Sequence, residues 1–358
     1  MSNPSPAPLP LLAGRNYRCH CGQPVFFRNS VCLACRTPLG YDCERGILLP
    51  LERVNASGEP ERTGVALWRA WHGGSASAAL YKRCRNLSTP ASCNWLIPAS
   101  DPHALCRACR LNRTIPDLTN PALPDNGYLW GLVEMAKRRL LSSLILLGLP
   151  VASRLTEDTQ RGLMFDLLRT QQGGPPIVTG HHTGLITLNV EEADDAKREA
   201  HRKALREPYR TLLGHFRHEV GHYYWGRLVA GSPWMDGFRE LFGNEQEDYP
   251  AALRRNYERG PSANWRQHFV SAYSSIHPWE DWAECWAHYL HMRDTVDTAL
   301  SFGLSVERFD LEFTPFTLEA TYQPDHPEAE QFLVFLNHWM RLTTMLNEMS
   351  HSMGLPDF

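Results

Sequence analysis

The residues best suited to chemistry lie in the segment HFRHEVGHYYW, which begins at His215. It contains the pattern H-E-x-x-H, formed by His218, Glu219 and His222. Residues four apart lie on one face of a helix, so both pattern histidines can direct their rings at one metal ion. The glutamate lies about 100° further around the helix, where it can reach a water molecule on that metal. The chain has 16 histidines, so two histidines of a buried helix are the alternative interpretation.

A catalytic zinc site needs a third protein ligand and one open position. We expect this ligand from the segment HPWEDWAECWAHYLH, a predicted helix that carries Glu280 and Glu284 four residues apart. Asp281 and His288 are the other candidates on this helix. His215, one turn before the pattern, could support the site or simply belong to the core.

In such a site the metal acts as a Lewis acid and lowers the pKa of its water to roughly 7. We expect Glu219 to accept the proton of that water and to deliver it to the leaving amine. The oxyanion needs one donor besides the metal. Tyr273, in the segment SAYSSIHPW, is our choice for this catalytic role, although a packed tyrosine fits the sequence as well. The further candidates are His277, His288, Tyr289 and His291.

Eight of the ten cysteines form two groups near the start of the chain. The first group is Cys19, Cys21, Cys32 and Cys35, and the second is Cys84, Cys93, Cys106 and Cys109. Thiolates two or three residues apart in a tight turn can share one tetrahedral ion, so we predict two structural four-cysteine zinc sites. Pairs from the two groups could also cross. Cys43 and Cys285 are left over, and we expect Cys285 to be a small core residue.

Composition indicates a folded soluble protein, with 43% hydrophobic and 21% charged residues. The first residues lack the basic region and apolar core of a secretion signal, and residues 140–151 are too short to span a bilayer, which takes about 20 residues. We therefore expect a cytoplasmic protein with reduced thiols and no membrane partner. Residues 1–115 carry 14 basic and 6 acidic residues. This balance permits a protein or nucleic-acid partner for the cysteine-rich part, although cysteine thiolates would reduce it.

The chain divides into a disordered N-terminus (1–16), a zinc-ribbon module (17–115) and a larger domain (116–358) that begins in the linker IPDLTNPALPDNG. Hydrophobic periodicity predicts helices at 128–148, 193–230, 278–300 and 328–354, with a kink or break at Pro208 in the second. Strands are predicted in 162–168 and 184–190. We expect TGLITLN (183–189) at a sheet edge where a peptide substrate can align. Residues 243–265 are expected to form a loop at a cleft wall.

H-E-x-x-H followed by a helix with E-x-x-x-[DE] resembles the gluzincin class of zinc metallopeptidases. The resemblance implies that Glu280 is the third ligand and that Glu284 orients a ligand histidine, although aspartate is common at that second position. Four segments, EPYRTLLGHFRHEVGHYYW, SAYSSIHPWEDWAECWAHYLH, CNWLIP and LCRACRLNRTIPDL, together resemble a bacterial family of zinc-binding metallopeptidases with an N-terminal zinc ribbon. This resemblance runs from about Cys19 to the end of the chain. The family name rests on its motif and supplies no substrate.

The sequence thus predicts an α+β protein. A β zinc-ribbon module precedes a zincin-like metallopeptidase domain with a small twisted sheet, an active-site helix and a mainly helical C-terminal lobe. The predicted activity is zinc-dependent hydrolysis of a peptide or protein, with one catalytic and two structural zinc ions. One alternative is a zinc-ribbon protein that binds protein or nucleic acid and has an inactive zincin domain. Another is a zinc hydrolase of a non-peptide amide. Glu219 argues against inactivity, because metal binding alone does not need it.

Overall fold

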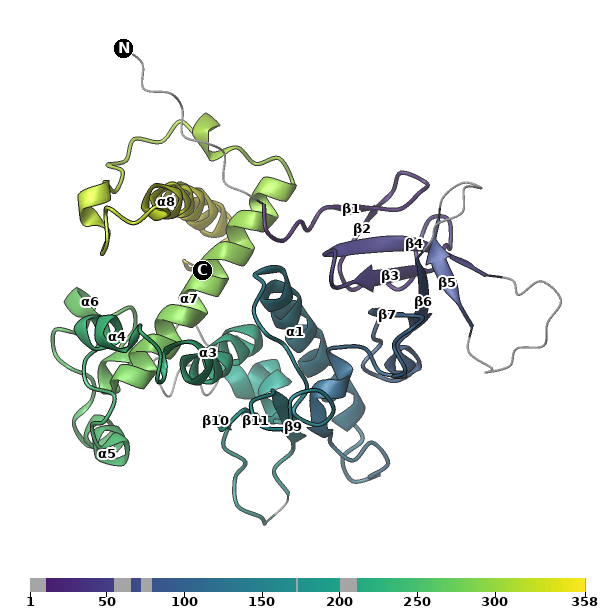
Figure 1. The fold of residues 1–358 in the computed structure, drawn as a ribbon, viewed down its shortest axis with the longest axis horizontal. Coiled ribbons are helices and arrows are strands. Elements are labelled where there is room, and N and C mark those ends of the chain that lie inside the picture. Colours follow the sequence, from purple (N-terminus) through teal and green to yellow (C-terminus); the bar gives the residue numbers. More distant parts are fainter. Residues whose placement is uncertain (1–10, 55–65, 72–78, 172, 200–210, 358) are drawn as a thin grey trace. The chain divides into compact units, whose positions relative to one another are not determined.

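The computed structural model describes residues 11–54, 66–71, 79–171, 173–199 and 211–357. The chain forms two compact units. The main unit is Tyr17–Leu290, and the terminal unit combines Met1–Asn16 with His291–Phe358. The architecture is mixed α/β, with a β-rich N-terminal region and a helical C-terminal part (Figure 1). Within the described residues, every helix is too short or too polar to cross a membrane.

The N-terminal region consists of short antiparallel strands, as the sequence predicts. A two-stranded sheet pairs β1 (Tyr17–Arg18) with β2 (Pro24–Val25). A second, five-stranded sheet has the order β3-β4-β5-β6-β7. Its strands are β3 (Leu39–Asp42), β4 (Ile47–Arg53), β5 (Trp68–Ala70), β6 (Leu80–Arg83) and β7 (Leu96–Pro98). Neighbouring strands of this sheet are antiparallel, and Cys84 and Cys93 lie in the segment between β6 and β7.

The third sheet has the order β10-β11-β9-β8. Its strands are β8 (Asn112–Thr114), β9 (Met164–Leu168), β10 (Gly180–His182) and β11 (Leu185–Asn189). Strand β11 alternates as expected, with Ile186 and Leu188 fully buried. Its predicted place at an edge is wrong, because β11 pairs with both β9 and β10. The turn at Thr183 and Gly184, with φ of 45° and 84°, folds β10 back as the terminal strand of this sheet.

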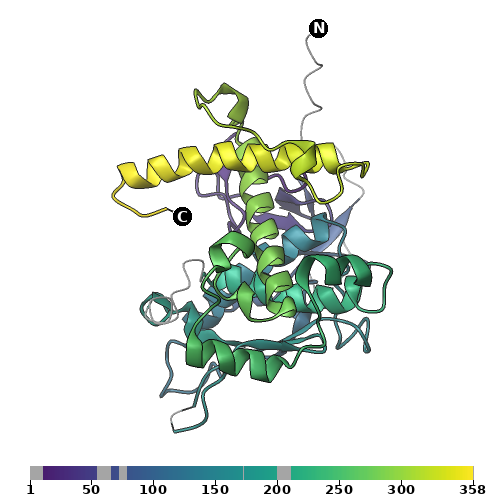
Figure 2. The same cartoon turned by 90° about the vertical axis from the view of Figure 1, so that its left-hand side faces the viewer.

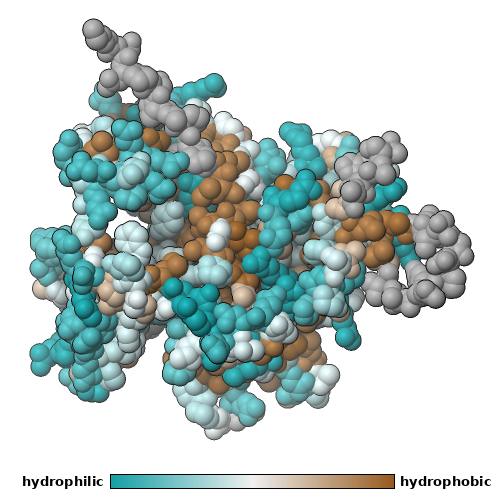
Figure 3. Space-filling view, viewed as in Figure 1, coloured by the Kyte–Doolittle hydropathy of each residue, from teal (hydrophilic) through white to brown (hydrophobic). Residues whose placement is uncertain are grey.

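The main unit contains α1 (Asn126–Leu146), α3 (Leu212–Tyr224), α4 (Met235–Phe242), α5 (Tyr249–Arg259), α6 (Trp265–His268) and the first turns of α7 (Pro278–Ser301). Helices α1 and α7 confirm their predictions. Within the helix expected at 193–230, α3 begins at Leu212, and Pro208, the expected site of a kink or break, lies outside the described residues. The expected loop at 243–265 contains α5, because Asp248 caps its first turn. The surface of α4 to α6 is largely hydrophilic (left side of Figure 3).

The terminal unit contains the last turns of α7 and the predicted long helix α8 (Ala329–Ser352), which crosses them (Figure 2). The expected disorder of residues 1–16 fails for their last part, whereas residues 1–10 lie outside the described residues. The Ala13 amide donates to the carboxylate of Asp297 over 3.2 Å, and buried Arg15 pairs with Asp294 at 3.0 Å. The Pro-rich composition predicts disorder here, whereas Ala13 and Arg15 make specific buried polar contacts.

One hydrophobic core runs through the main unit. It begins among the cysteines and continues through α1 and the third sheet to α3. Trp95, Leu111, Trp130, Phe165 and Phe216 are among its fully buried members. Strand β8 comes before the predicted boundary at 115, yet it pairs with β9 beyond that boundary. The core is therefore continuous where the sequence suggests a linker.

Candidate metal centre

Helix α3 carries the H-E-x-x-H pattern in the interior of the main unit. The Thr211 hydroxyl accepts a hydrogen bond from the Gly214 amide at 2.9 Å and so caps the first turn. One face of the helix is fully buried: Phe216, Val220 and Tyr224. This burial fixes the rotation of α3, so that His218 and His222 lie one turn apart on the face next to α7.

Helix α7 approaches α3 at a glycine. A Cβ atom added to Gly221 would lie 3.0 Å from Cα of Ala283, so the backbones need the absence of a side chain here. The indole of Trp282 donates to the carbonyl oxygen of Gly221 at 2.9 Å. This contact brings the first turns of α7, with Glu280 and Glu284, beside the two histidines of α3.

Three potential ligand atoms converge between the helices. The Nε2 atoms of His218 and His222 are 3.2 Å apart, and Oε2 of Glu280 lies 3.0 Å and 3.6 Å from them. Ligands held about 2.05 Å from a tetrahedral zinc ion lie about 3.3 Å from one another. The three separations match that value, so these residues can hold one metal ion. The Glu280 Oε2 atom is buried and faces these two histidine nitrogens.

The electrostatics of this site favour a cation. Burial lowers the pKa of His218, but hydrogen bonds with Glu280 and Glu284 raise it well above the ordinary histidine value. Burial raises the pKa of Glu280, but the hydrogen bonds of His218 and His222 hold it well below its ordinary value. Both pKa shifts have the same cause: the ring nitrogens and carboxylate oxygens that meet here favour a positive charge between them. A divalent metal ion supplies that charge.

Two further residues orient the ligands. The Nδ1 atom of His218 lies 2.8 Å from Oε1 of Glu284, which turns Nε2 toward the convergence point. The hydroxyl of Tyr249 donates to Oε1 of Glu280 at 2.6 Å and leaves Oε2 for the metal. Glu284 was singled out in the sequence. Tyr249 was not, because nothing in its spacing distinguishes it within a segment that we expected to be a loop.

The pattern glutamate belongs to a chain of polar contacts. Buried Glu219 has its Oε1 atom 3.3 Å from Nε2 of His215, and Nδ1 of His215 lies 2.6 Å from Oε2 of Glu192. Thr179 donates its hydroxyl proton to Glu192. Burial lowers the pKa of His215, but the charge of Glu192 raises it to about 9. Burial raises the pKa of Glu219, and His215 lowers it below its ordinary value, so Glu219 is a carboxylate near neutral pH.

Of the candidate oxyanion donors, Tyr273 contacts the ligand candidate His218. Its ring packs edge-on against His218 with 5.9 Å between ring centroids. Burial raises the pKa of its phenol, and the charge of Glu280 adds to this, so the hydroxyl keeps its proton. The ring of His288 donates from Nδ1 to the carbonyl oxygen of Glu284 at 2.8 Å.

The other candidates have different positions. Nδ1 of His277 accepts from the Trp279 amide at 3.1 Å, and its Nε2 donates to the Glu247 carbonyl at 3.1 Å. His277 therefore secures the start of α7. Tyr289 is partly exposed, and His291 belongs to the terminal unit.

Strand β10 lies beside α3. The ring of His181 is stacked at 6.4 Å from that of His222 and lies edge-on at 6.3 Å from that of Tyr223. Its Nε2 accepts a hydrogen bond from the Gly184 amide at 2.9 Å, and burial lowers its pKa to about 4, so it is neutral. Tyr223, whose role the sequence left open, is buried.

The first cysteine group lies around the β1–β2 hairpin. The Sγ atoms of Cys19 and Cys35 are 3.6 Å apart, and those of Cys21 and Cys32 are 3.8 Å apart. Thiolates on one tetrahedral zinc ion lie about 3.8 Å from one another. The four sulfur atoms therefore fit one structural zinc ion. Cys21 and Cys35 are exposed, so this site lies at the surface.

The second cysteine group is enclosed. Cys84, Cys93, Cys106 and Cys109 are all buried and also fit one structural zinc ion. The Sγ atoms of Cys93 and Cys106 are 3.5 Å apart, and the Cys106 amide donates to the sulfur of Cys84. The two groups stay separate, so their pairs do not cross. The thiols left over contact acids instead: Cys43 contacts Glu44, and Cys285 contacts Asp281.

Comparison with known proteins agrees with both kinds of site. A family model described as "Putative zinc-binding metallo-peptidase" matches residues 126–358, and a zinc-ribbon domain model matches residues 16–120. The chain belongs to this metallopeptidase family. Uncharacterized proteins of Mycobacterium tuberculosis and Mycobacterium bovis are 39% identical over 350 residues, which cover 96% of this chain and 89% of theirs. No solved structure matches the chain.

The fold of this family member brings together most of the residues that the sequence singled out for the metal site. The ligand candidates come from α3 and α7. The residues that sequence reasoning missed are Tyr249, Glu192 and Thr179, each of which contacts a singled-out residue or its partner. No local pattern marks these three, because their contacts join segments that are distant in sequence.

Proposed function

We propose that the chain is a zinc-dependent peptidase of the gluzincin type with a zincin-like fold. The observation that carries this proposal is the convergence of His218, His222 and Glu280 next to the carboxylate of Glu219. Metal storage or a structural metal site needs no carboxylate of this kind beside the ligands. Each cysteine group would hold one structural zinc ion, and clustered cysteines that bind metal are typical of a cytoplasmic protein.

A zinc ion bound by these three ligands supplies Lewis acidity and lowers the pKa of water to roughly 7. Glu219 takes the proton of the attacking water and passes it to the leaving amine. His215 holds Oε1 of Glu219, which leaves the other carboxylate oxygen for that proton. Glu192 keeps His215 doubly protonated, so that His215 donates in both directions.

The substrate is a peptide or protein. We assign the oxyanion donor to Tyr273, because its ring packs against His218 and its protonated hydroxyl can donate a hydrogen bond. Strand β10 replaces β11 as the strand on which the peptide aligns. It is the terminal strand of its sheet in the described part of the chain, and it lies beside the ligand His222.

A proteome cleavage screen tests the activity. Wild-type protein and the Glu219→Gln variant are incubated with peptides from a bacterial lysate, and new termini are identified by mass spectrometry. Glu219→Gln keeps the shape and the metal ligands but removes the base, so we expect its cleavages to disappear. Identical cleavage patterns would exclude the peptidase mechanism. An absence of cleavage by the wild-type protein, with zinc bound, would favour a non-peptide amide substrate or a binding function.

Metal analysis tests the site separately. We expect three zinc ions per wild-type chain and two in the His218→Ala variant, because one of three converging ligands is lost. Native mass spectrometry counts the ions directly. Two ions in both proteins would contradict the proposed catalytic metal.

A further inference from the structure

The second cysteine group is joined to the metal-binding helix by a short physical path. Its last two cysteines, Cys106 and Cys109, immediately precede β8, an end strand of the third sheet. We propose that the metal ion held by this cysteine group braces α3, so that the site of His218, His222 and Glu280 keeps its own ion only when the cysteine site is filled. This inference rests on the proposed metal site but not on the peptidase reaction.

Two adjacent peptide groups connect the sites. Arg107, which stands between two of the cysteines, donates from Nε to the carbonyl oxygen of Val151 at 3.1 Å. Tyr224, on α3 two residues after the ligand His222, donates its hydroxyl proton to the carbonyl oxygen of Pro150 at 3.0 Å. Tyr224 and Val151 are buried, and both hydrogen bonds are partly buried. The cysteine turn therefore contacts Val151, and the ligand helix contacts the adjacent residue Pro150.

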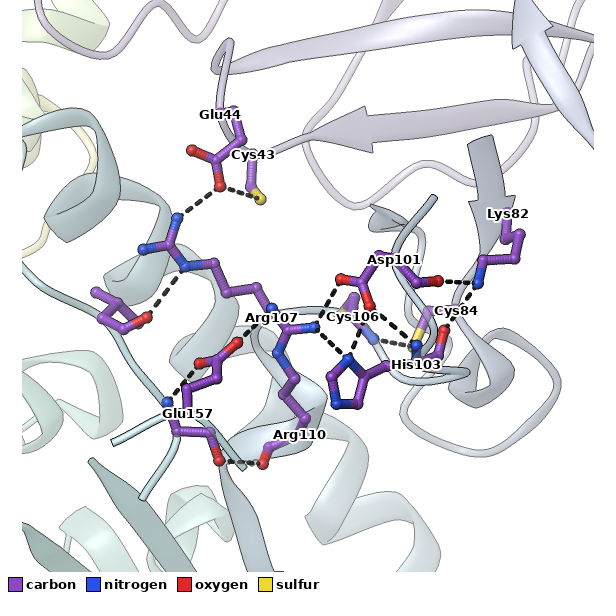
Figure 4. Close-up of polar contacts among 12 residues, drawn as sticks. Cys43, Glu44, Lys82, Cys84, Asp101, His103, Cys106, Arg107, Arg110 and Glu157 are labelled. Atoms are coloured by element: carbon purple, nitrogen blue, oxygen red, sulfur yellow. Dashed lines mark hydrogen bonds and ion pairs between the residues drawn. The ribbon is translucent and has the colours of Figure 1, made fainter. Parts of the chain in front are cut away.

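The residues that follow Val151 also contact both the cysteine turn and α3. The guanidinium of Arg110 pairs with Glu157 at 2.7 Å, and the Ser153 hydroxyl donates to the Arg110 carbonyl at 2.9 Å. On the other side, Tyr223 of α3 donates to the Arg161 carbonyl at 3.0 Å. Figure 4 shows Arg107 and Arg110 extending from the cysteine turn into this network of acids and carbonyl groups. Residues 150–161 thus form a strut between the cysteine site and α3.

Helix α1 supplies a second path. Its buried Arg138 donates to the Ala91 carbonyl at 2.9 Å, within the stretch between the first two cysteines of the group. The guanidinium of Arg138 also lies 3.9 Å from the carboxylate of Glu134 on the same helix. A Cβ atom on Gly131 would lie 2.7 Å from the carbonyl oxygen of Pro90, so α1 lies directly against this stretch. Helix α1 in turn lies against α3.

The first cysteine group provides the internal comparison. It lies at the surface, with Cys21 and Cys35 exposed, whereas the second group is enclosed by the shared core. Loss of a metal ion from the first group should therefore remove that ion alone. Loss of the ion from the second group should also release the ion of the α3–α7 site. Both the strut and α1 contact the second cysteine group, so both lose a fixed attachment when its ion leaves.

The test measures metal affinity in the full chain. Arg107→Ala and Tyr224→Phe each remove one of the two bonds to residues 150–151 and leave every metal ligand in place. The zinc-loaded proteins are titrated with a chelator, and bound ions are counted by native mass spectrometry. The His218→Ala variant identifies which ion belongs to the α3–α7 site. Arg28→Ala, an exposed arginine between the cysteine pairs of the first group, is the matched control.

We expect Arg107→Ala and Tyr224→Phe each to lower the affinity of the α3–α7 site about tenfold or more, the range seen when partners of metal ligands are removed. The double variant should lower the affinity by less than the product of the two single fold-changes, because both substitutions act on residues 150–151. Arg28→Ala should match the wild-type protein. Affinities within twofold of the wild-type value in both strut variants would overturn the inference.

A second comparison uses the cysteines themselves. Cys35→Ser should leave two ions, and Cys109→Ser should leave one, with the native near-ultraviolet circular dichroism spectrum used to verify folding of the remainder. Retention of the α3–α7 ion by folded Cys109→Ser protein would also overturn the inference. A wild-type chain with only two ions would overturn the metal-site proposal and this inference together. Three ions with unchanged strut variants would overturn this inference alone.

Discussion

At the scale of single residues, two glutamates on one face of α7 have different roles at the metal site. Glu280 directs Oε2 between the two histidine nitrogens, and Glu284 contacts the opposite nitrogen of His218. The ring of His218 is thus held from both sides. A carboxylate on the far nitrogen fixes the tautomer and increases the basicity of the nitrogen that faces the metal.

The hydrogen bond from Tyr249 should set how firmly Glu280 is held. We expect Tyr249→Phe to lower zinc affinity at the α3–α7 site about tenfold to 100-fold, because Glu280 loses the partner that fixes its orientation. Chelator competition measures the change. Tyr257→Phe on the same helix is the control, because Tyr257 is exposed and should have no effect. Equal zinc affinity in the two variants would show that Glu280 needs no such partner.

His215 should affect catalysis rather than metal binding. We expect His215→Gln to keep its zinc and to lose about tenfold or more in kcat, because Glu219 is no longer held by a charged donor. The measurement pairs kcat and KM for a peptide found in the cleavage screen with zinc content. Glu192→Gln should act in the same direction through His215. A variant with reduced zinc and unchanged kcat per bound ion would assign His215 to the metal site instead.

At the scale of elements, the site depends on how closely α3 and α7 approach. Each helix is stable for local reasons: Thr211 caps α3, and α7 begins with Pro278. Their approach is a separate matter, decided by Gly221 and by the indole bond from Trp282. A small separation of the helices would move Glu280 away from both histidines at once.

We therefore expect Gly221→Ala to destabilise the zinc-loaded protein by about 1–3 kcal/mol, the usual cost of overpacking, and to weaken zinc binding at the same time. Urea unfolding and chelator titration measure the two effects. Gly226→Ala is the matched control, because a Cβ atom there meets nothing within 4 Å. Loss of stability without loss of zinc affinity would separate helix packing from ligand geometry.

At the scale of the whole molecule, the cysteine-rich region and the metal-binding helices share one core. Trp95 and Leu111 from the N-terminal side and Trp130 from α1 are buried in it together. The zinc-ribbon match ends at residue 120 and the metallopeptidase match begins at residue 126, both within the segment 115–127 that we expect to be a linker. The boundary between the two family matches is therefore not a boundary between two hydrophobic cores.

A chain of residues 116–358 should consequently fold poorly. It lacks β8 and the N-terminal side of the core, so we expect broad thermal unfolding, a weak near-ultraviolet circular dichroism spectrum and binding of a hydrophobic dye. The full chain with zinc is measured beside it. Sharp, cooperative unfolding of residues 116–358 with zinc bound at the α3–α7 site would contradict the shared core and restore two independent domains.

The sequence by itself determined the features that depend on short spacing. The i, i+4 histidines of α3, the i, i+4 glutamates of α7, the cysteine pairs and the periodic helices α1, α7 and α8 all follow from local geometry. The residues that contact the ligands in space could not be found this way. Tyr249 and Glu192 meet their partners across many residues of chain, and neither carries a periodic signal.

Tertiary structure alone decided the rest. It placed β10 rather than β11 at the end of its sheet, because strand order depends on long-range pairing. It kept the cysteine groups apart, buried Arg15 in a segment expected to be disordered, and joined the second cysteine group to α3 through residues 150–161. These outcomes depend on which surfaces exclude water together, and that is a property of the packed chain rather than of any short stretch of it.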